Sequence, residues 1–162
     1  MKKRFFLQNI VFRNWRNNYN VLKDKTFEEL TKTELYEILK LRSEIFIVEQ
    51  EGCYQDIDDI DYRSLHIFSQ DENGRVNSYL RLYYKEDEEE TVQIGRVVTL
   101  THGIGLGGKL LKKGVQTAIE RMHAKCLFID SRKDAAGFYE KEGFHICPNE
   151  ELPYYEMRRY IK

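Results

Sequence analysis

A glycine-rich segment between an apolar stretch and an amphipathic stretch constrains the fold of this chain more than any other feature. Residues 102–108 read HGIGLGG. Residues 91–100 before the glycines are rich in strand formers, and residues 106–122 after them carry apolar side chains at helical spacing. Such a strand–loop–helix unit presents unpaired backbone N–H groups at the positive end of a helix, where phosphate oxygens bind. We therefore predict a phosphate-binding loop at 102–108, against the alternative of a plain glycine-rich turn.

The other hydrophobic patterns predict one mixed α/β domain whose central sheet is mostly antiparallel and is flanked by helices. Thr31 and Glu34 form a capping box before a helix at 32–48, and the acidic stretch 49–63 that follows is predicted to be a loop. The remaining predicted elements are strands at 65–69 and 76–84 joined by a turn at Asn73-Gly74, a strand at 91–100, a helix at 106–122, a strand at 126–130, a helix opened by Ser131 with Asp134 and closed by Gly143, and closing strands at 144–147 and 154–160.

Length and charge restrict the class of protein. The 162 residues, 41% of them hydrophobic, suffice for one domain, which we place at 21–162 after an N-terminal arm at 1–20. The arm lacks a secretion signal because polar residues interrupt its apolar start. A formal charge of -1 provides no overall attraction to nucleic acid, and no apolar run is long enough to span a membrane.

Cysteine and histidine spacing bears on location and metal binding. The three cysteines are far apart, which disfavours a disulfide framework and favours a reducing, cytoplasmic location. The four histidines form no pair at zinc-ligand spacing, so we predict no metal.

Three nucleotide-like ligands compete for the glycine segment. Gly103, Gly105 and Gly108 match a GxGxxG dinucleotide pattern, and Gly103, Gly108 and Lys109 match most of a P-loop. Leu110 stands where a P-loop needs Ser or Thr for magnesium, which disfavours nucleotide hydrolysis. Only about 50 residues follow the glycines, too few for the rest of a dinucleotide fold and a substrate domain. Coenzyme A is the third ligand.

The segment resembles the acyl-CoA-binding motif of the GNAT N-acetyltransferase superfamily, Arg/Gln-x-x-Gly-x-Gly/Ala, with His102 at its first position. Residues 138–144, FYEKEGF, are similar to a second motif of the family. Residues 35–50 and 54–58 resemble the ElaA-like branch, and the similarity spans about 27 to 160. The chain departs from the family pattern at His102, at Arg132, where many members have Asn, and at 152–154, where Leu-Pro-Tyr replaces Ile-Pro-His.

The resemblance implies a GNAT fold and direct transfer of an acetyl group from acetyl-CoA to a primary amine in a ternary complex. It implies Tyr139 as the proton donor to the departing thiolate and a backbone N–H near 97–99 as the partner of the acyl oxygen. The expected coenzyme-binding residues are Val97, Val98, Thr99, His102, Gly103, Ile104, Gly105, Leu106, Gly107, Gly108, Lys109 and Arg132. From helix periodicity alone, Tyr139 would instead be a core aromatic residue.

An amine acceptor is mostly cationic at neutral pH, so a carboxylate-lined approach would attract it and relay its proton. The acidic loop supplies candidates, although clustered loop carboxylates are more often solvated. The expected acceptor-binding residues are Glu49, Tyr54, Gln55, Asp56 and Asp58. His66 is an alternative base, but a buried structural histidine suits its apolar strand better. The competing functions are a non-catalytic sensor that binds coenzyme A or a nucleotide and a nicotinamide oxidoreductase; the expected assembly is a monomer or homodimer.

Overall fold

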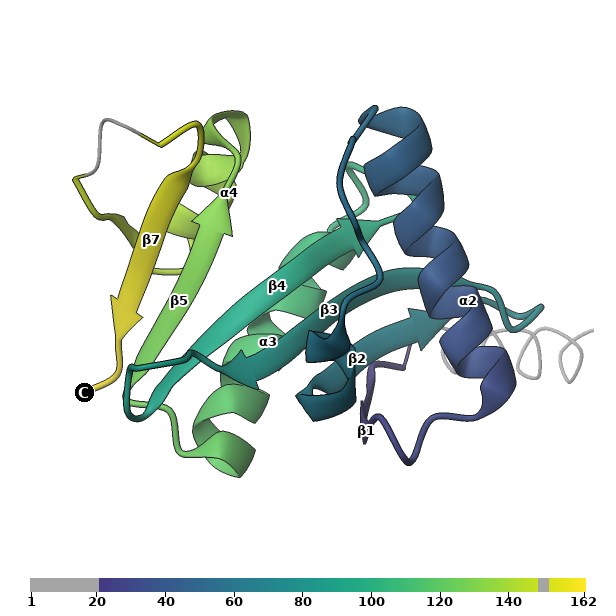
Figure 1. Ribbon diagram of the computed structural model, residues 1–162, viewed down its shortest axis with the longest axis horizontal. Helices are drawn as coiled ribbons and strands as arrows, with labels where there is room; N and C mark the ends of the chain where they lie inside the picture. Colours follow the sequence, from purple (N-terminus) through teal and green to yellow (C-terminus); the bar gives the residue numbers. More distant parts are fainter. Residues whose placement is uncertain (1–20, 149–151) are drawn as a thin grey trace, which may run out of the picture.

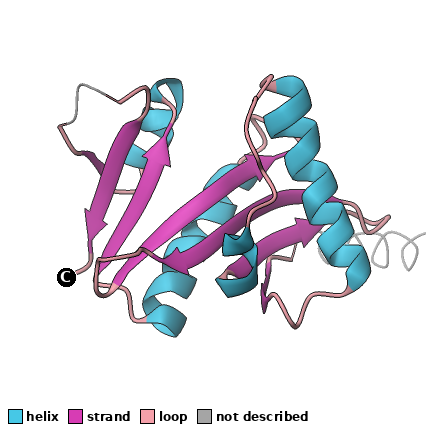
Figure 2. Ribbon diagram, in the orientation of Figure 1, coloured by secondary structure: helices cyan, strands magenta, loops and turns pink. Residues whose placement is uncertain are grey.

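Seven strands form one sheet in the part of the chain that the computed structural model describes, residues 21–148 and 152–162. The predicted arm at 1–20 lies outside the described residues. The strand order is β1-β2-β3-β4-β5-β7-β6, and all neighbours are antiparallel except β4 and β5 (Figures 1 and 2). The strands are β1 Lys23–Thr26, β2 Leu65–Gln70, β3 Val76–Tyr84, β4 Thr91–Thr99, β5 Cys126–Ser131, β6 His145–Ile146 and β7 Tyr155–Tyr160. The predicted mixed α/β fold with a mostly antiparallel sheet is confirmed.

Two helices cover opposite faces of the sheet because successive strand residues point to opposite sides. Helix α2 (Lys32–Arg42) buries Ile38 against Phe68 of β2, whereas α3 (Leu106–Met122) buries Leu110 against the neighbouring Ile67. In Figure 1, α2 lies in front of the sheet and α3 behind it. Helix α4 (Ala136–Glu140) follows β5. The shorter helical turns are η1 Ser43–Glu49, η2 Asp59–Arg63 and η3 Lys133–Ala135.

The parallel pair β4–β5 determines where the sheet opens. Thr91–Gln93 pair with Cys126–Phe128, and the two strands then diverge (Figure 1). On its other side β4 has a bulge against β3, because Tyr79 pairs with Val98 and Arg81 with Gly95. Leu80 therefore faces two residues, Arg96 and Val97, and Arg96 takes a left-handed φ of 56°. The opening and the bulge lie next to the glycine-rich segment.

The helix predicted at 32–48 changes its hydrogen bonding partway along. The capping box of Thr31 and Glu34 is present, and α2 ends at Arg42. Residues Ser43–Glu49 continue as the π-helical turn η1, which the Gln50 N–H closes with a bond to the Ile45 carbonyl five residues earlier. A 3.6-residue apolar period does not distinguish these two windings, so the helical extent was predictable from the sequence but the wider turn was not.

Two local predictions were wrong in detail, and one strand was not predicted. Ser131 and Asp134 form no capping box, because the Arg132 guanidinium binds the Asp134 carboxylate and the Ser131 hydroxyl donates to a neighbouring carbonyl. The Asn73-Gly74 turn has a positive φ only at Gly74, and the Asp71 N–H closes a wider loop by donating to the Arg75 carbonyl. Strand β1 was missed because its sequence, KDKT, has no apolar alternation.

Among the described residues, no helix has the length and apolar character that crossing a membrane requires.

Candidate functional site

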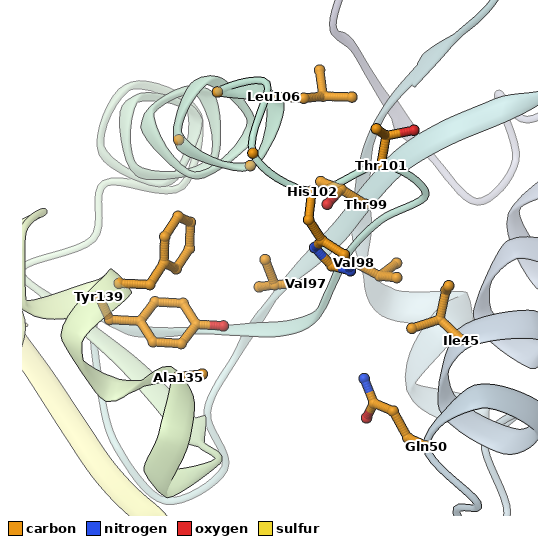
Figure 3. Close-up of a pocket in the computed structure, with 15 residues that line it drawn as sticks. Ile45, Gln50, Val97, Val98, Thr99, Thr101, His102, Leu106, Ala135 and Tyr139 are labelled. Carbon is orange, nitrogen blue, oxygen red and sulfur yellow. The ribbon is translucent and has the colours of Figure 1, made fainter.

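A pocket of about 350 Å³ lies where β4 separates from β5, at the start of α3 (Figure 3). Its lining comes from η1 and the residue after it, the end of β4, the glycine segment, and the turn into α4. These residues are Ile45, Gln50, Val97, Val98, Thr99, Thr101, His102, Gly103, Gly105, Leu106, Gly107, Gly108, Ala135, Phe138 and Tyr139. The structure thus brings most of the predicted coenzyme-binding residues and Tyr139 to one pocket.

The glycine segment has the backbone geometry of an anion-binding loop. Gly103 and Gly105 have positive φ values of 79° and 77°, which residues with a Cβ rarely adopt. A methyl group at either position would meet no other atom within 4 Å, so the dihedral rather than crowding within the protein requires glycine. Gly105 caps the 17-residue helix α3, whose first N–H groups have no acceptor within the helix. These donors and the helix dipole fit the diphosphate of a coenzyme.

The first turn of α3 packs directly against α4, which joins the two sequence motifs in space. A methyl group at Gly107 would lie 3.6 Å from the Phe138 ring and 3.7 Å from Thr99. The rings of Phe138 and Tyr139 meet edge to face with centroids 5.1 Å apart. The glycine loop and the second motif are therefore two sides of one site.

Tyr139 combines a buried ring with a hydroxyl that points into the pocket (Figure 3). The residue is 8% exposed, and its ring packs against Phe144 as well as Phe138. Burial disfavours the phenolate and raises the pKa of Tyr139 to about 12. The hydroxyl consequently keeps its proton throughout the neutral pH range. The ring is thus a core aromatic, as helix periodicity predicts, and the hydroxyl faces the pocket, which the role of proton donor would require.

The wall opposite Tyr139 comes from η1. Ile45 and Gln50 face the pocket from that side in Figure 3. Sequence reasoning did not select either residue, and it also missed Thr101, Ala135 and Phe138. Gln50 and Phe138 belong to the segments that carried the family resemblance, so their motifs held a usable signal. Ile45 belongs to the same segment as Gln50, but its apolar periodicity alone would assign it to the core.

Three of the predicted coenzyme-binding residues are not in the lining. Ile104 is 64% exposed. Lys109 lies one residue beyond the lining glycines, on the first turn of α3. Arg132 forms an ion pair with Asp134, both exposed, at the mouth of the turn after β5.

None of the five predicted acceptor-binding residues lines the pocket. Glu49 ends η1, while Tyr54 and Gln55 lie on the surface of the following loop. Asp56 is buried between Arg42 and Arg96, and Asp58 binds Arg81 and Arg96. These two carboxylates are therefore paired rather than solvated.

His66 occupies the structural position that its apolar strand favoured. Its ring nitrogens lie 2.8 Å from the Tyr79 hydroxyl and 2.9 Å from the Asp61 carbonyl oxygen. Burial is the largest influence on its pKa and lowers it, despite the opposing effect of Asp61. Within the described residues, no group of three or more His, Cys, Asp or Glu side chains is placed to bind a metal.

Comparison with known proteins agrees with this geometry. A family model described as an acetyltransferase (GNAT) domain matches residues 27–153. A UPF0039 protein of Schizosaccharomyces pombe is 33% identical over 141 residues, covering 83% of this chain and 93% of that protein. The protein ElaA of Escherichia coli is 30% identical over 146 residues, covering 85% of this chain and 95% of ElaA.

Solved structures extend the comparison to the fold. An acyl-CoA N-acyltransferase from Pseudomonas aeruginosa superposes with a TM-score of 0.79 at 32% identity, covering 86% of this chain and 98% of that one. Escherichia coli ElaA superposes with a TM-score of 0.78 at 30% identity, covering 86% of this chain and 99% of ElaA. The chain therefore belongs to the GNAT acetyltransferase family and is an acyltransferase with an acyl-CoA donor. Its relatives within that family are ElaA and the UPF0039 proteins, as the sequence resemblance implied.

Proposed function

We propose that this enzyme transfers the acetyl group of acetyl-CoA to a primary amine by direct attack in a ternary complex. The observation that carries the proposal is one pocket that combines a glycine-capped helix N-terminus with the protonated hydroxyl of Tyr139. The first feature suits the diphosphate of a thioester carrier, and the second suits its leaving sulfur.

The donor would bind with its diphosphate at the N–H groups of 103–108 and its acyl end toward Tyr139. A backbone N–H of β4 near 97–99 would donate a hydrogen bond to the acyl oxygen and stabilise its developing negative charge, because this strand end is free of β5. His102 lies in the lining at the position where the family motif has Arg or Gln. Its imidazole lacks the bidentate, permanently charged guanidinium of arginine, so we expect weaker coenzyme binding than an arginine at this position would give.

In the reaction, the neutral amine nitrogen forms a bond to the thioester carbon and the carbon–sulfur bond breaks. The Tyr139 hydroxyl donates its proton to the departing thiolate, and the amine proton leaves through water. A phenol with a pKa of about 12 holds a proton to give at neutral pH. The acceptor would approach from the side of Ile45 and Gln50, opposite the Tyr139 ring.

Two measurements test the proposal. Calorimetry should detect coenzyme A binding, and a panel of primary amines should release free thiol from acetyl-CoA. Tight coenzyme binding without thiol release from any amine would contradict catalysis and favour the sensor function. Binding of NAD in preference to coenzyme A would instead favour an oxidoreductase. A cytoplasmic location and a monomeric or homodimeric state stay predictions.

A further inference from the structure

Six charged side chains beside the pocket form a closed ring in which arginine and aspartate alternate. Each arginine binds two aspartates and each aspartate binds two arginines, which leaves the ring with no net charge. Around the ring the pairs are Arg42–Asp56, Asp56–Arg96, Arg96–Asp58, Asp58–Arg81, Arg81–Asp61 and Asp61–Arg42, with N–O distances from 2.5 to 3.3 Å. The members come from α2, the acidic loop with η2, β3 and β4.

The inner half of the ring is a buried structural element. Arg42 and Arg81 are 0% and 1% exposed, and Asp61 is buried between them. In the described structure, Asp61 Oδ2 and Arg81 Nε have no hydrogen-bond partner. Removing one partner of such a buried pair leaves an uncompensated charge, so substitutions here threaten folding.

Arg96 belongs to the outer, partly exposed half and is the member next to the pocket in the chain. It occupies the β4 bulge directly before Val97 and Val98, which line the pocket. A left-handed φ is unfavourable for a residue with a Cβ and persists where surrounding contacts hold it. The Arg96 guanidinium provides those contacts: Nε lies 2.7 Å from the Asp56 carboxylate, and Nη2 lies 3.3 Å from that of Asp58.

The aspartates that bind Arg96 lie on the loop that follows η1. Gln50 lines the pocket, and the chain reaches Asp56 six residues later. Between them, the ring of Tyr54 lies 5.6 Å from the Arg96 guanidinium. Arg96 thus joins both sides of the acceptor approach, the β4 backbone and the loop after Gln50.

We propose that Arg96 is a positioning residue for acyl transfer: together with Asp56 and Asp58 it fixes the acceptor-side loop against the β4 backbone that faces the acyl group. The inference rests on the proposed function. It assigns the two aspartates to loop placement rather than to direct capture of the amine, since their carboxylates are already occupied by arginines.

The decisive variant is Arg96→Gly, because glycine adopts the left-handed φ of the bulge without a side chain. It is therefore compatible with the backbone conformation of the bulge and removes the whole arginine side chain, guanidinium included. The probe is the primary amine that gives the fastest thiol release with the wild-type enzyme. We expect the KM of this amine to rise by about tenfold to a hundredfold, a loss no larger than the roughly 100-fold rate loss that misplacement by about 1 Å can cause. The Kd for coenzyme A should change less than about twofold, since the glycine loop is untouched.

Matched controls separate positioning from stability. Asp58→Asn and Glu88→Gln each convert a partly exposed carboxylate paired with arginine into its amide, at side-chain exposures of 26% and 29%. Only Asp58→Asn should raise the KM of the amine, because Glu88 binds Arg158 away from the pocket. Arg96→Lys keeps the charge and should recover part of the loss.

A double variant, Arg96→Gly with Asp58→Asn, distinguishes positioning from direct amine binding. If the aspartate acts through Arg96, the double variant will resemble the worse single variant. The proposal would be overturned if the increase in KM of the double variant equalled the product of the two single increases. An unchanged KM in a folded Arg96→Gly variant would overturn it as well. A wild-type protein without coenzyme binding or thiol release would instead refute the proposed function, and the inference with it.

Discussion

At the residue scale, the proposed function assigns proton transfer to Tyr139, whose ring is buried while its hydroxyl faces the pocket. We expect Tyr139→Phe to lower kcat by between about 100-fold and 10,000-fold, the usual contribution of a general acid, and to leave the Kd of coenzyme A nearly unchanged. Steady-state thiol release and calorimetry measure the two effects. The matched control is Tyr83→Phe, which removes the hydroxyl of a tyrosine that is also 8% exposed but outside the lining.

An equal loss of rate in both tyrosine variants would indicate a packing effect. Unchanged turnover of Tyr139→Phe across the pH range would remove the phenol from the mechanism. The position of Tyr139 beside the pocket was predictable only through the family motif, since a helical aromatic beside another aromatic has the same pattern in any core. Its role as proton donor stays a prediction.

The backbone dihedral φ of Gly105 provides a test of the proposed coenzyme A binding. A Cβ at this φ of 77° costs about 1 to 2 kcal/mol, and the strained loop would turn its N–H groups away from the diphosphate. We therefore expect Gly105→Ala to weaken coenzyme A binding at least about tenfold, which corresponds to 1.4 kcal/mol. Gly74→Ala is the control, because Gly74 has a φ of 80°, equally open surroundings and no place in the pocket.

Both glycine variants should lose similar stability in a thermal melt, and only Gly105→Ala should lose binding in calorimetry. Equal coenzyme affinity in the two variants would contradict a role for the loop backbone. This part of the site was predictable from sequence because glycines at a strand–helix junction have few alternative explanations.

At the element scale, the start of α2 depends on one side-chain cap. The Thr31 hydroxyl accepts from the Glu34 N–H at 3.1 Å, and the Glu34 carboxylate accepts from the Thr31 N–H at 3.0 Å. We expect Thr31→Ala to lower the free energy of unfolding by about 1 kcal/mol in urea titrations. The control is Thr117→Val on α3, since the buried Thr117 hydroxyl has no hydrogen-bond partner in the described structure.

Replacement of the Thr117 hydroxyl by a methyl group removes no hydrogen bond of the described structure, so this variant should be neutral or more stable. Greater destabilisation by Thr117→Val than by Thr31→Ala would contradict this account of the two hydroxyls. The cap was predictable from the sequence because both of its residues lie within a four-residue segment. The π-helical turn at the end of α2 has no comparable local sequence pattern.

At the scale of the whole molecule, the sequence predicted the class of sheet, but long-range ion pairing had no signal. Arg42, Asp56, Arg81 and Arg96 are separated by many residues, and each looks like an ordinary solvated charge within its own segment. Burial and pairing emerge only when the sheet brings β3, β4 and α2 together. The acidic loop was therefore interpreted as an acceptor-binding surface, whereas Asp56, Asp58 and Asp61 form a neutral, partly buried ring with three arginines.

Paired carboxylates spread over the molecule also determine its behaviour in acid. Burial alone would raise the pKa of Glu34, but hydrogen bonds from Lys25 and the Thr31 N–H outweigh it and lower the pKa from 4.5 to about 2. A hydrogen bond from Arg158 is the main reason that the pKa of Glu88 also falls to about 2. Burial opposes the effect of Arg81 on Asp58, whose pKa is nevertheless lowered.

For such groups the unfolded chain binds protons more readily than the native protein, so stability is lost as pH falls. We expect the free energy of unfolding, measured in urea, to begin to decrease as pH falls below 6.5, because burial lowers the pKa of His66. It should decrease further between about pH 4.5 and pH 2, the window between the two pKa values of the paired carboxylates. Glu34→Gln should start less stable and decline less steeply, since its contribution to the acid dependence is gone. A slope identical to that of the wild type would show that the ion pairs of Glu34 with Lys23 and Lys25 do not carry the stability assigned to them.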